Sequence, residues 1–305
     1  MTRSVLGVVG LAILNIAVAL LLAPLYEGLL RKLKAAIHSR IGPPIIQPYL
    51  DTLKLLGKED LRSIGGAAYE LLPALALGTV LLLATLVPMG AAPPLAFAGD
   101  IVAVLYVAAA STVLLMLTAY ASGSPYGAVG GSREMMLLLS VEPVVAATLV
   151  VGAVKAGTLS TGGIMSWNAA HGPSISMLLA AVAMFLALQA QAGKLPFDIA
   201  EADQEIMGGP LVEQSGPRLA LFRWTLWVKQ LVFALLLVEV FFPWPRLGML
   251  PLDLLLALAK ALVVLVLVAL IDVVNPRLRV EQAMGYYLRV VFSSVAALAF
   301  ALVGM

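Results

Sequence analysis

The amino-acid sequence predicts an all-α integral membrane protein with eight transmembrane helices, both termini outside and one amphipathic cytoplasmic helix. Hydrophobic residues make up 62% of the 305 positions and charged residues only 12%, against about 25% in soluble domains. Apolar stretches long enough to cross a bilayer recur along the whole chain. Lysine and arginine are concentrated in alternate connections between these stretches. We therefore expect one polytopic membrane domain over residues 1–305, with the lipid bilayer as its main solvent.

Eight segments between charges and Pro or Gly breaks approach the roughly 20 apolar residues that a crossing helix needs. They are Ser4–Tyr26, Leu71–Leu95, Ile101–Ala121, Met135–Val154, Ile175–Gly193, Trp224–Pro243, Leu252–Ile271 and Tyr287–Leu302. The apolar run of the first is too long for a signal peptide, and no convincing small-residue cleavage site follows it. We therefore expect this segment to remain as a span.

The basic residues predict the orientation of these spans. Of the 19 lysines and arginines, 14 fall in the four connections that follow the first, third, fifth and seventh spans, and only 3 fall on the opposite side. Short cytoplasmic connections carry such an excess. Adding or removing one span would destroy this asymmetry, so the pattern supports eight spans with both termini outside.

Two long cytoplasmic connections, about Glu27–Glu70 and Lys194–Arg223, show neither strand alternation nor the composition of a linker. Within the first, residues 48–58 predict a short helix with an apolar face. That face carries Tyr49, Leu50, Leu53 and Leu56. Such a helix would lie along the membrane surface or against a partner. The second, residues 194–223, is predicted to be an acidic cytoplasmic coupling loop.

Ionisable side chains inside a span cost about 2.5–3.5 kcal/mol each on insertion scales, so each of them needs a reason. Four are predicted to lie within spans: Glu142, Lys229, Glu239 and Lys260. Lys229 is only a few residues inside its span and can snorkel to the cytoplasm. A role without function and a functional role are therefore equally open for this residue. Glu239 is similarly close to the outer end of the same span.

Glu142 and Lys260 are the stronger candidates for proton chemistry. Glu142 is about two turns deep and precedes Pro143, which leaves an upstream carbonyl free and kinks the helix. A carboxylate beside a kink suits a water-lined proton site, and a structural ion pair is the alternative. Lys260 lies close to the middle of its span and needs a carboxylate partner or a neutral state, which makes it a candidate member of a proton relay.

The coupling loop concentrates acidic residues over a short stretch. The five carboxylates are Asp198, Glu201, Asp203, Glu205 and Glu213. If the segment after Pro196 is helical, Asp198, Glu201 and Glu205 share one stripe and Asp203 points away. Repulsion along that stripe would raise some of the carboxyl pKa values, as proton uptake near neutral pH requires. A solvated loop face is the alternative, but the apolar residues interleaved between two spans favour a functional role.

The residues that several kinds of redox, metal and nucleotide chemistry require are absent from this sequence. It has no cysteine, and its two histidines, His38 and His171, fall in connections. Disulfides, cysteine-held Fe–S clusters and a thiolate nucleophile are therefore excluded, and no transmembrane histidine pair is available for haem. There is no phosphate-binding G-x-x-x-x-G-K-[ST] motif, and a net charge of +2 does not indicate nucleic acid. We expect no catalytic residue, metal or cofactor in this chain.

A set of motifs follows in order along the chain: Arg40-Ile-Gly-Pro43, Lys54-Leu-Leu-Gly-Lys-Glu59, Gly130-Gly-Ser-Arg-Glu134, Val141-Glu-Pro143, Leu195-Pro-Phe-Asp-Ile-Ala-Glu-Ala-Asp-Gln-Glu205 and Glu213-Gln-Ser-Gly216. In this order, and over essentially the whole chain, the sequence resembles the subunit-1 family of respiratory complex I. The block from Leu195 to Glu205 is the most specific of them.

Within this family, the sequence is similar to the branch of energy-converting nickel–iron hydrogenases, which includes formate hydrogenlyase and CO-linked complexes. The segment Arg40–Gln47 is shorter than its counterpart in complex I, which usually has a second Gly-Pro. The residues Ser122-Gly-Ser-Pro-Tyr126 and Gly193-Lys-Leu-Pro196 match the sequences of the hydrogenase branch. The Glu-Arg pair that complex I carries near its first span is here Leu30-Arg31, with Glu27 one turn earlier. This departure weighs against a quinone site.

The resemblance implies a membrane-anchor and coupling subunit of a hydrogenase complex in a prokaryotic cytoplasmic membrane. It implies that the NiFe centre and the Fe–S clusters lie in partners, namely the hydrogenase large and small subunits and a ferredoxin-like Fe–S subunit, with antiporter-like membrane subunits beside them. Translocation of protons or Na⁺ would be linked to H₂ formation. The implied proton-coupling residues are Glu142, Asp198, Glu201, Asp203, Glu205, Glu213, Lys260 and Asp272, and the implied partner-docking residues are Arg31, Arg40, Asp51, Lys54, Arg133 and Lys194.

Three other interpretations remain open from the sequence. The first is the quinone-chamber subunit of complex I, which would belong to a flavin-containing, nickel-free complex. The second is a stand-alone ion or solute carrier, which would be active alone in liposomes. The third is a purely structural anchor for a soluble enzyme, in which Glu142 and Lys260 could be made apolar without loss of coupling.

Overall fold

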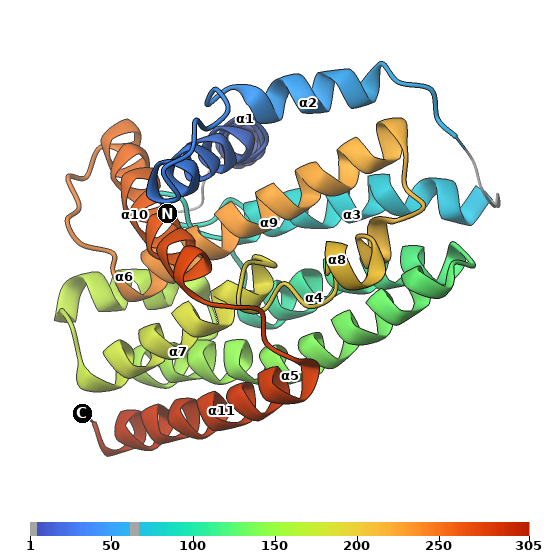
Figure 1. The fold of residues 1–305 in the computed structure, drawn as a ribbon. Helices are drawn as coiled ribbons and strands as arrows, with labels where there is room; N and C mark the ends of the chain where they lie inside the picture. Colours follow the sequence, from blue (N-terminus) through green and yellow to red (C-terminus); the bar gives the residue numbers. More distant parts are fainter. Residues whose placement is uncertain (1–4, 62–66, 305) are drawn as a thin grey trace.

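The structure is a computed structural model that describes residues 5–61 and 67–304, and within these ranges it is entirely helical (Figure 1). The α-helices are α1 (Val5–Ile37), α2 (Gln47–Leu56), α3 (Ala67–Leu86), α4 (Asp100–Ala121), α5 (Pro125–Ala156), α6 (Thr161–His171), α7 (Ile175–Gln191), α8 (Asp203–Ile206), α9 (Gly216–Phe241), α10 (Leu250–Val274) and α11 (Val280–Val303), and a 3₁₀ turn η1 spans Gly209–Leu211. The predicted all-α class is confirmed for the described residues.

Each of the eight predicted spans overlaps a helix, but α3 ends at Leu86, nine residues before the predicted end of its span at Leu95. Among the described residues, seven helices are long and apolar enough to cross a membrane: α1, α3, α4, α5, α9, α10 and α11. The eighth segment is α7, whose 17 residues rise only about 26 Å against a hydrocarbon core of about 30 Å. The chain is therefore a multi-pass membrane protein, while the count of eight spans and the side of the termini stay predictions. Three residues used in those predictions, Arg3, Ser4 and Arg62, lie outside the described residues.

Two helices extend further than predicted, at the ends that the basic residues assign to the cytoplasm, and both extensions carry charge. α1 continues to Ile37, about three turns beyond the expected end at Tyr26. α5 begins at Pro125, well before the expected start at Met135, because a proline in the first turn has no intrahelical hydrogen bond to lose. It ends before Gly157, whose φ of 64° is left-handed and favours glycine. The helix ends therefore place charged residues above the membrane-spanning part of the bundle.

Helix α9 is the buried axis of the bundle. In its most apolar 18-residue window 89% of the residues are buried, compared with 11% in α1. It packs against α1, α3, α7 and α10, and Figure 1 shows it crossing the centre of the bundle. A helix that is apolar on all sides requires such a position. The polar residues in the buried part of α9, Lys229, Gln230 and Glu239, are therefore held inside the protein.

The helix predicted at residues 48–58 corresponds to α2, which packs against α1 and α9 (Figure 1). Pro48 and Thr52 are buried against the protein. The apolar residues Leu50, Leu53 and Leu56 are exposed on the opposite side. This arrangement is compatible with contact to a membrane surface or a partner, and that contact stays a prediction.

The expectation of a helical stripe after Pro196 is wrong. Between α7 and α9 only the single turn Asp203–Ile206 is α-helical. The chain before it is irregular and buries Phe197 and Ile199, and the Phe197 ring lies 4.8 Å from that of Tyr287. Burying apolar side chains outweighs the local helix propensity of this segment. The acidic residues of the loop consequently point to different partners.

The loop is seated on α5 at a point where only glycine fits. A Cβ atom on Gly130 would lie 2.6 Å from Pro210 Cδ and 2.7 Å from Gly209 Cα. Contacts this short require the loop backbone to move. Gly130 therefore fixes the height of the loop above the membrane-spanning helices.

We predict that Gly130→Ala destabilises the protein by about 1–3 kcal/mol, because the added methyl group pushes the Gly209–Leu211 turn away from α5. The matched control is Gly78→Ala in α3, where no atom lies within 4 Å of the new Cβ and the helix gains the higher propensity of alanine. Thermal unfolding in detergent measures both changes. A Gly130→Ala midpoint equal to or above that of Gly78→Ala would contradict this packing.

Candidate functional site

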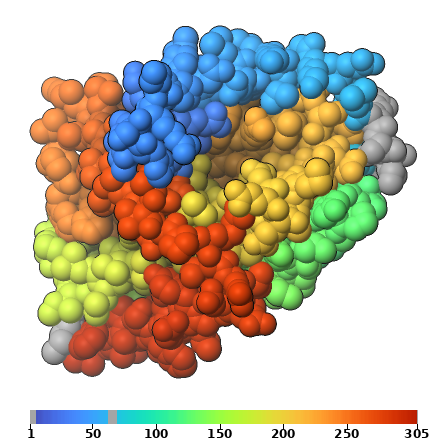
Figure 2. All heavy atoms as spheres, in the orientation of Figure 1, coloured from blue at the N-terminus to red at the C-terminus, as the bar shows by residue number. Residues whose placement is uncertain are grey.

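A large charged chamber opens where the coupling loop faces α1 and α9. Its volume is about 640 Å³, and it is lined by Glu27, Arg31, Ala192, Gly193, Lys194, Glu201, Asp203, Met207, Gly208, Leu211, Val212, Gln214, Leu219, Arg223, Leu226, Trp227 and Gln230. Figure 2 shows this face hollowed between the blue segments of α1 and α2 and the yellow and gold segments of the loop and α9. Six of these residues are formally charged, so the chamber suits water, ions or a polar group more than an apolar ligand.

A buried carboxylate organises one wall of the chamber. Glu27 is only 6% exposed and accepts hydrogen bonds from Lys194 Nζ at 3.0 and 3.2 Å. Arg31 Nε lies 3.2 Å from the same carboxylate, and Arg31 Nη1 lies 3.4 Å from Asp51 on α2. The Arg31 guanidinium also lies over the Trp227 ring, 5.7 Å from its centroid. These contacts tie α1, α2, α9 and the loop together, because an unpaired charge here would be costly.

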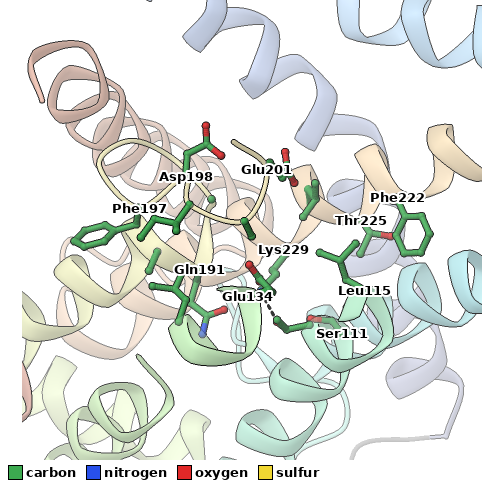
Figure 3. Close-up of a pocket in the computed structure, with 17 residues that line it drawn as sticks. Ser111, Leu115, Glu134, Gln191, Phe197, Asp198, Glu201, Phe222, Thr225 and Lys229 are labelled. Atoms are coloured by element: carbon green, nitrogen blue, oxygen red, sulfur yellow. Dashed lines mark hydrogen bonds between the residues drawn. The ribbon is translucent and has the colours of Figure 1, made fainter. Parts of the chain in front are cut away.

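A smaller inner cavity of about 30 Å³ lies behind the chamber (Figure 3). The two share Glu201, Gly193 and Leu226 in their linings. The inner cavity is lined by Ser111, Thr112, Leu115, Glu134, Leu137, Ala190, Gln191, Gly193, Phe197, Asp198, Ile199, Ala200, Glu201, Phe222, Thr225, Leu226 and Lys229. Its volume is enough for a water molecule or two.

A third space of about 10 Å³ continues from the inner cavity along α5. It shares Thr112, Glu134 and Gln191 with the inner cavity and reaches Val141, the neighbour of Glu142. The Glu142 carboxylate interacts with the Gln191 side chain, and its Oε1 atom is buried with no hydrogen-bond partner among the described residues. The three spaces therefore form a series from the chamber to Glu134 and Gln191, and the Gln191 side chain interacts with Glu142, the carboxylate beside the α5 proline.

Lys229 does not snorkel, contrary to the option left open from the sequence. Its side chain lies inside the bundle, the residue is only 5% exposed, and Nζ donates a 2.7 Å hydrogen bond to Thr112 Oγ1 on α4. In Figure 3 Lys229 and Glu134 point into the same cavity. The Lys229 charge interacts with Glu134 and with Glu142. A basic residue thus stands between two carboxylates of α5.

Glu201 separates the chamber from the inner cavity, because it lines both. Burial, together with the negative charges of Asp198 and Glu134, raises the pKa of Glu201 from an ordinary 4.5 to about 7. A carboxyl group that titrates near neutral pH at such a boundary can exchange a proton with either side.

The other acidic residues of the loop have partners of different kinds. Asp198 pairs with Arg277 at 3.0 Å, and the exposed Glu205 pairs with Arg133 at 2.7 Å. The hydrogen bond from Arg133 holds the pKa of Glu205 below its ordinary value. These two pairs fasten the loop to α5 and to the connection between α10 and α11. Asp203 faces the chamber, whereas Glu213 lines neither the chamber nor the inner cavity.

Asp272 lies near the C-terminal end of α10, whereas Lys260 lies near its middle. Asp272 accepts a 3.0 Å hydrogen bond from the Leu195 backbone and pairs with Lys34, so it anchors the start of the loop. Lys260 lies 3.5 Å from Glu239 and donates a 2.9 Å hydrogen bond to Phe242 O. Glu239 is ten positions beyond Lys229, about 15 Å along α9. The structure therefore does not place Lys260 with Glu142 and the loop.

The predicted docking residues divide into two groups. Arg31, Asp51, Arg133 and Lys194 form ion pairs within the chain, so their charges stabilise the chamber and the loop. Arg40 and Lys54 are exposed on and before α2.

Three residues of this site were absent from the predicted set: Glu27, Glu134 and Lys229. Glu134 was placed ahead of the fourth span, but with α5 starting at Pro125 it lies in the same helix as Glu142. Their spacing of eight residues, slightly over two turns, was the available signal. Glu27 lies one position beyond the predicted end of the first span, and its signal was that position directly after a long apolar run.

Comparison with known proteins gives consistent matches over most of the chain. The sequence profile of the NADH dehydrogenase family matches residues 9–303. Formate hydrogenlyase subunit 4 of Escherichia coli K12 is 36% identical over 269 residues, covering 85% of this chain and 87% of that protein. Hydrogenase-4 component C of the same organism is 35% identical over 273 residues, covering 86% and 85% respectively.

Two further similarities extend these matches. NADH-quinone oxidoreductase subunit 8 of Thermus thermophilus is 30% identical over 254 residues, covering 76% of this chain and 69% of that protein. A chain in the structure of the membrane-bound sulfane sulfur reductase, an archaeal respiratory membrane complex, superposes with a TM-score of 0.88 at 31% identity. That superposition covers 97% of this chain and 99% of the other.

We predict that Glu201→Gln stabilises the protein at pH 8 and leaves its stability unchanged at pH 4. A raised pKa means that the folded state holds this proton more tightly than the unfolded state, so stability falls as pH rises from 4.5 through about 7. Removing the titrating group removes this loss, up to about 3 kcal/mol because one pKa unit corresponds to about 1.4 kcal/mol. Unfolding midpoints of both proteins across this pH range measure the difference, and parallel curves at all pH values would contradict it.

Proposed function

The chain belongs to the NADH dehydrogenase family and is a membrane subunit of the type found in oxidoreductase complexes, and from this we propose that it anchors and couples an energy-converting nickel–iron hydrogenase. In this proposal the subunit docks a soluble redox arm in a prokaryotic cytoplasmic membrane. It links electron transfer and H₂ formation in that arm to the translocation of protons or Na⁺. The observation that carries the proposal is the series of cavities from the chamber through Glu201 to Glu134 and Lys229, continued to Glu142 by its interaction with Gln191, which lines the inner cavity.

The chamber is the natural place for a partner to act on this chain. It faces the side to which the basic residues assign the cytoplasm, and its lining carries three cations and three carboxylates. A partner subunit that carries an Fe–S cluster would dock over it, beside α2 with its exposed Arg40 and Lys54. The electron carriers themselves would be in the partners, because this chain has no cysteine to hold a cluster.

A change of charge in the redox arm would cause a proton to move within this chain. An electron arriving near the chamber attracts a proton, and Glu201, with a pKa of about 7, can bind or release one at the chamber wall. The inner cavity would pass this proton to Glu134 and then, past Lys229, to Glu142. Low dielectric surroundings strengthen the electrostatic interaction among these groups. Asp198, Asp203, Glu205, Glu213, Lys260 and Asp272 remain candidates for tuning this transfer.

A second candidate function is the quinone-chamber subunit of a respiratory dehydrogenase. Two observations favour it: a 30% identical NADH-quinone oxidoreductase subunit, and a chamber of about 640 Å³, within the range of small-molecule sites. The charged lining of the chamber and the higher identity to the two hydrogenase-related subunits favour the first function.

Metal and flavin analysis of the complex that co-purifies with this chain separates the two functions. We predict nickel and iron without FMN, because a hydrogenase arm carries a NiFe centre and Fe–S clusters. Elemental analysis by mass spectrometry and flavin fluorescence of the denatured complex give the result. FMN without nickel would overturn the hydrogenase proposal in favour of the quinone alternative.

We predict that Glu134→Gln and Glu142→Gln each lower the number of ions translocated per H₂ by roughly tenfold or more, because each removes a group able to carry a proton. Inverted membrane vesicles that contain the whole complex allow gradient formation and H₂ to be measured together. Glu281→Gln is the matched control, since Glu281 is exposed at the start of α11. Wild-type ratios in both test variants would exclude the proposed path.

A further inference from the structure

Lys229 is a basic residue buried in the interior of the bundle, where its head group reaches neither solvent nor the membrane surface. It lies in the middle of α9, the helix that is surrounded by α1, α3, α7 and α10. An ammonium group in such a place is expensive unless it is hydrogen-bonded and paired. Its one hydrogen bond in the described residues goes to Thr112, a neutral hydroxyl. Its placement therefore points to a role in the cavity that it lines.

The groups around Lys229 are acidic or neutral on every side. α5 presents Glu134 and Glu142, and α4 presents the Thr112 and Ser111 hydroxyls. Gln191 of α7 and the loop carboxylates Asp198 and Glu201 complete the polar part of the inner cavity. Lys229 is the one basic residue in the described lining of that cavity.

The two α5 carboxylates cannot exchange a proton directly. Glu134 and Glu142 are eight positions apart, which corresponds to about 12 Å along the helix. A hydrogen bond spans about 3 Å, so at least one further group has to stand between them. Lys229 comes from α9 and lines the inner cavity together with Glu134, its charge interacts with both carboxylates, and its long side chain has three rotatable donors.

Resting on the proposed function, we propose that Lys229 carries the proton between Glu134 and Glu142. In the first step the Glu134 carboxyl O–H breaks and the neutral Lys229 amine binds the proton, which leaves a carboxylate and an ammonium. In the second step the ammonium releases that proton to the Glu142 carboxylate, and the neutral amine returns. Water in the 30 Å³ inner cavity can bridge the first step, because Glu134 and Lys229 both line that cavity. No electron moves and no co-reactant is needed.

Thr112 suits both forms of the lysine. A threonine hydroxyl accepts a hydrogen bond from the ammonium and can donate one to the amine. The 2.7 Å contact to Nζ therefore keeps the head group in the cavity throughout the cycle. Thr112 is a positioning residue in this scheme, because it acts through Lys229.

A permanent counter-ion is the competing role for Lys229, and arginine distinguishes the two. Arginine keeps the positive charge but does not release its proton in proteins. If Lys229 only neutralises the carboxylates, Lys229→Arg should couple normally. If Lys229 has to release its proton, Lys229→Arg should fail as completely as Lys229→Met, which preserves much of the side-chain length without charge.

The test measures ions translocated per H₂ by the whole complex in inverted vesicles, with complex yield and thermal midpoint as controls for assembly. We expect Lys229→Met and Lys229→Arg to lose roughly tenfold or more of the ratio. Lys229→His provides a titratable group even if arginine does not assemble, and its ratio should recover partly with an optimum displaced towards the pKa of histidine, about 6.5. A fully coupled Lys229→Arg complex, or a Lys229→His ratio that does not depend on pH, would overturn the proposal.

Failure of the Lys229 proposal and failure of the proposed function give different results. If Glu134→Gln and Glu142→Gln uncouple the complex while Lys229→Arg remains coupled, only the role of Lys229 is refuted. If the two glutamine variants remain fully coupled, the proposed path fails as a whole. Thr112→Val removes the hydrogen bond to Lys229 and should weaken coupling less than Lys229→Met, and wild-type coupling in it would refute the positioning role of Thr112.

Discussion

The cost of burying charge in a protein surrounded by lipid is the constraint on which this structure depends. Each charge inside the bundle has to be compensated within the protein, because hydrocarbon offers no hydrogen bonds. Glu27 is compensated by Lys194 and Arg31, and Lys229 by Thr112 and the acidic groups of the inner cavity. These requirements bring α1, α4, α5, α9 and the coupling loop to one place. The same charges that hold the elements together are the ones able to exchange protons.

The fold arranges these buried charges in a line from the chamber into the bundle. Helix α9 is buried on all sides, so its Lys229 faces the interior, while the extensions of α1 and α5 raise Glu27 and Glu134 to the level of the coupling loop. The loop lies over the ends of these helices and is fastened by ion pairs to α5 and to the α10–α11 connection. A partner that binds at the chamber would therefore act on charges that continue into the membrane part of the bundle.

Hydropathy and the positive-inside pattern were sufficient to locate every long helix, because both reflect the bilayer directly. The structure of the coupling loop was not predictable in the same way. Its path is set by the burial of Phe197 and Ile199 against residues distant in the sequence, and its carboxylates find partners in α5 and beyond α10. The role of Lys229 was left open because distance from a span end does not reveal which neighbours surround α9. Glu134 was missed because the start of α5 depended on a proline ahead of the apolar run.

If the proposed coupling operates, a redox change in the partner arm alters the protonation of carboxyl groups in this chain. Infrared difference spectroscopy of the intact complex, poised oxidised and then under H₂, measures this most directly. We expect a carboxyl C=O signal that shifts in D₂O and is lost when Glu201 or Glu134 is replaced by glutamine, with the iron–sulfur reduction itself unchanged. A redox difference spectrum with no carboxyl signal, or one that persists in both variants, would contradict it.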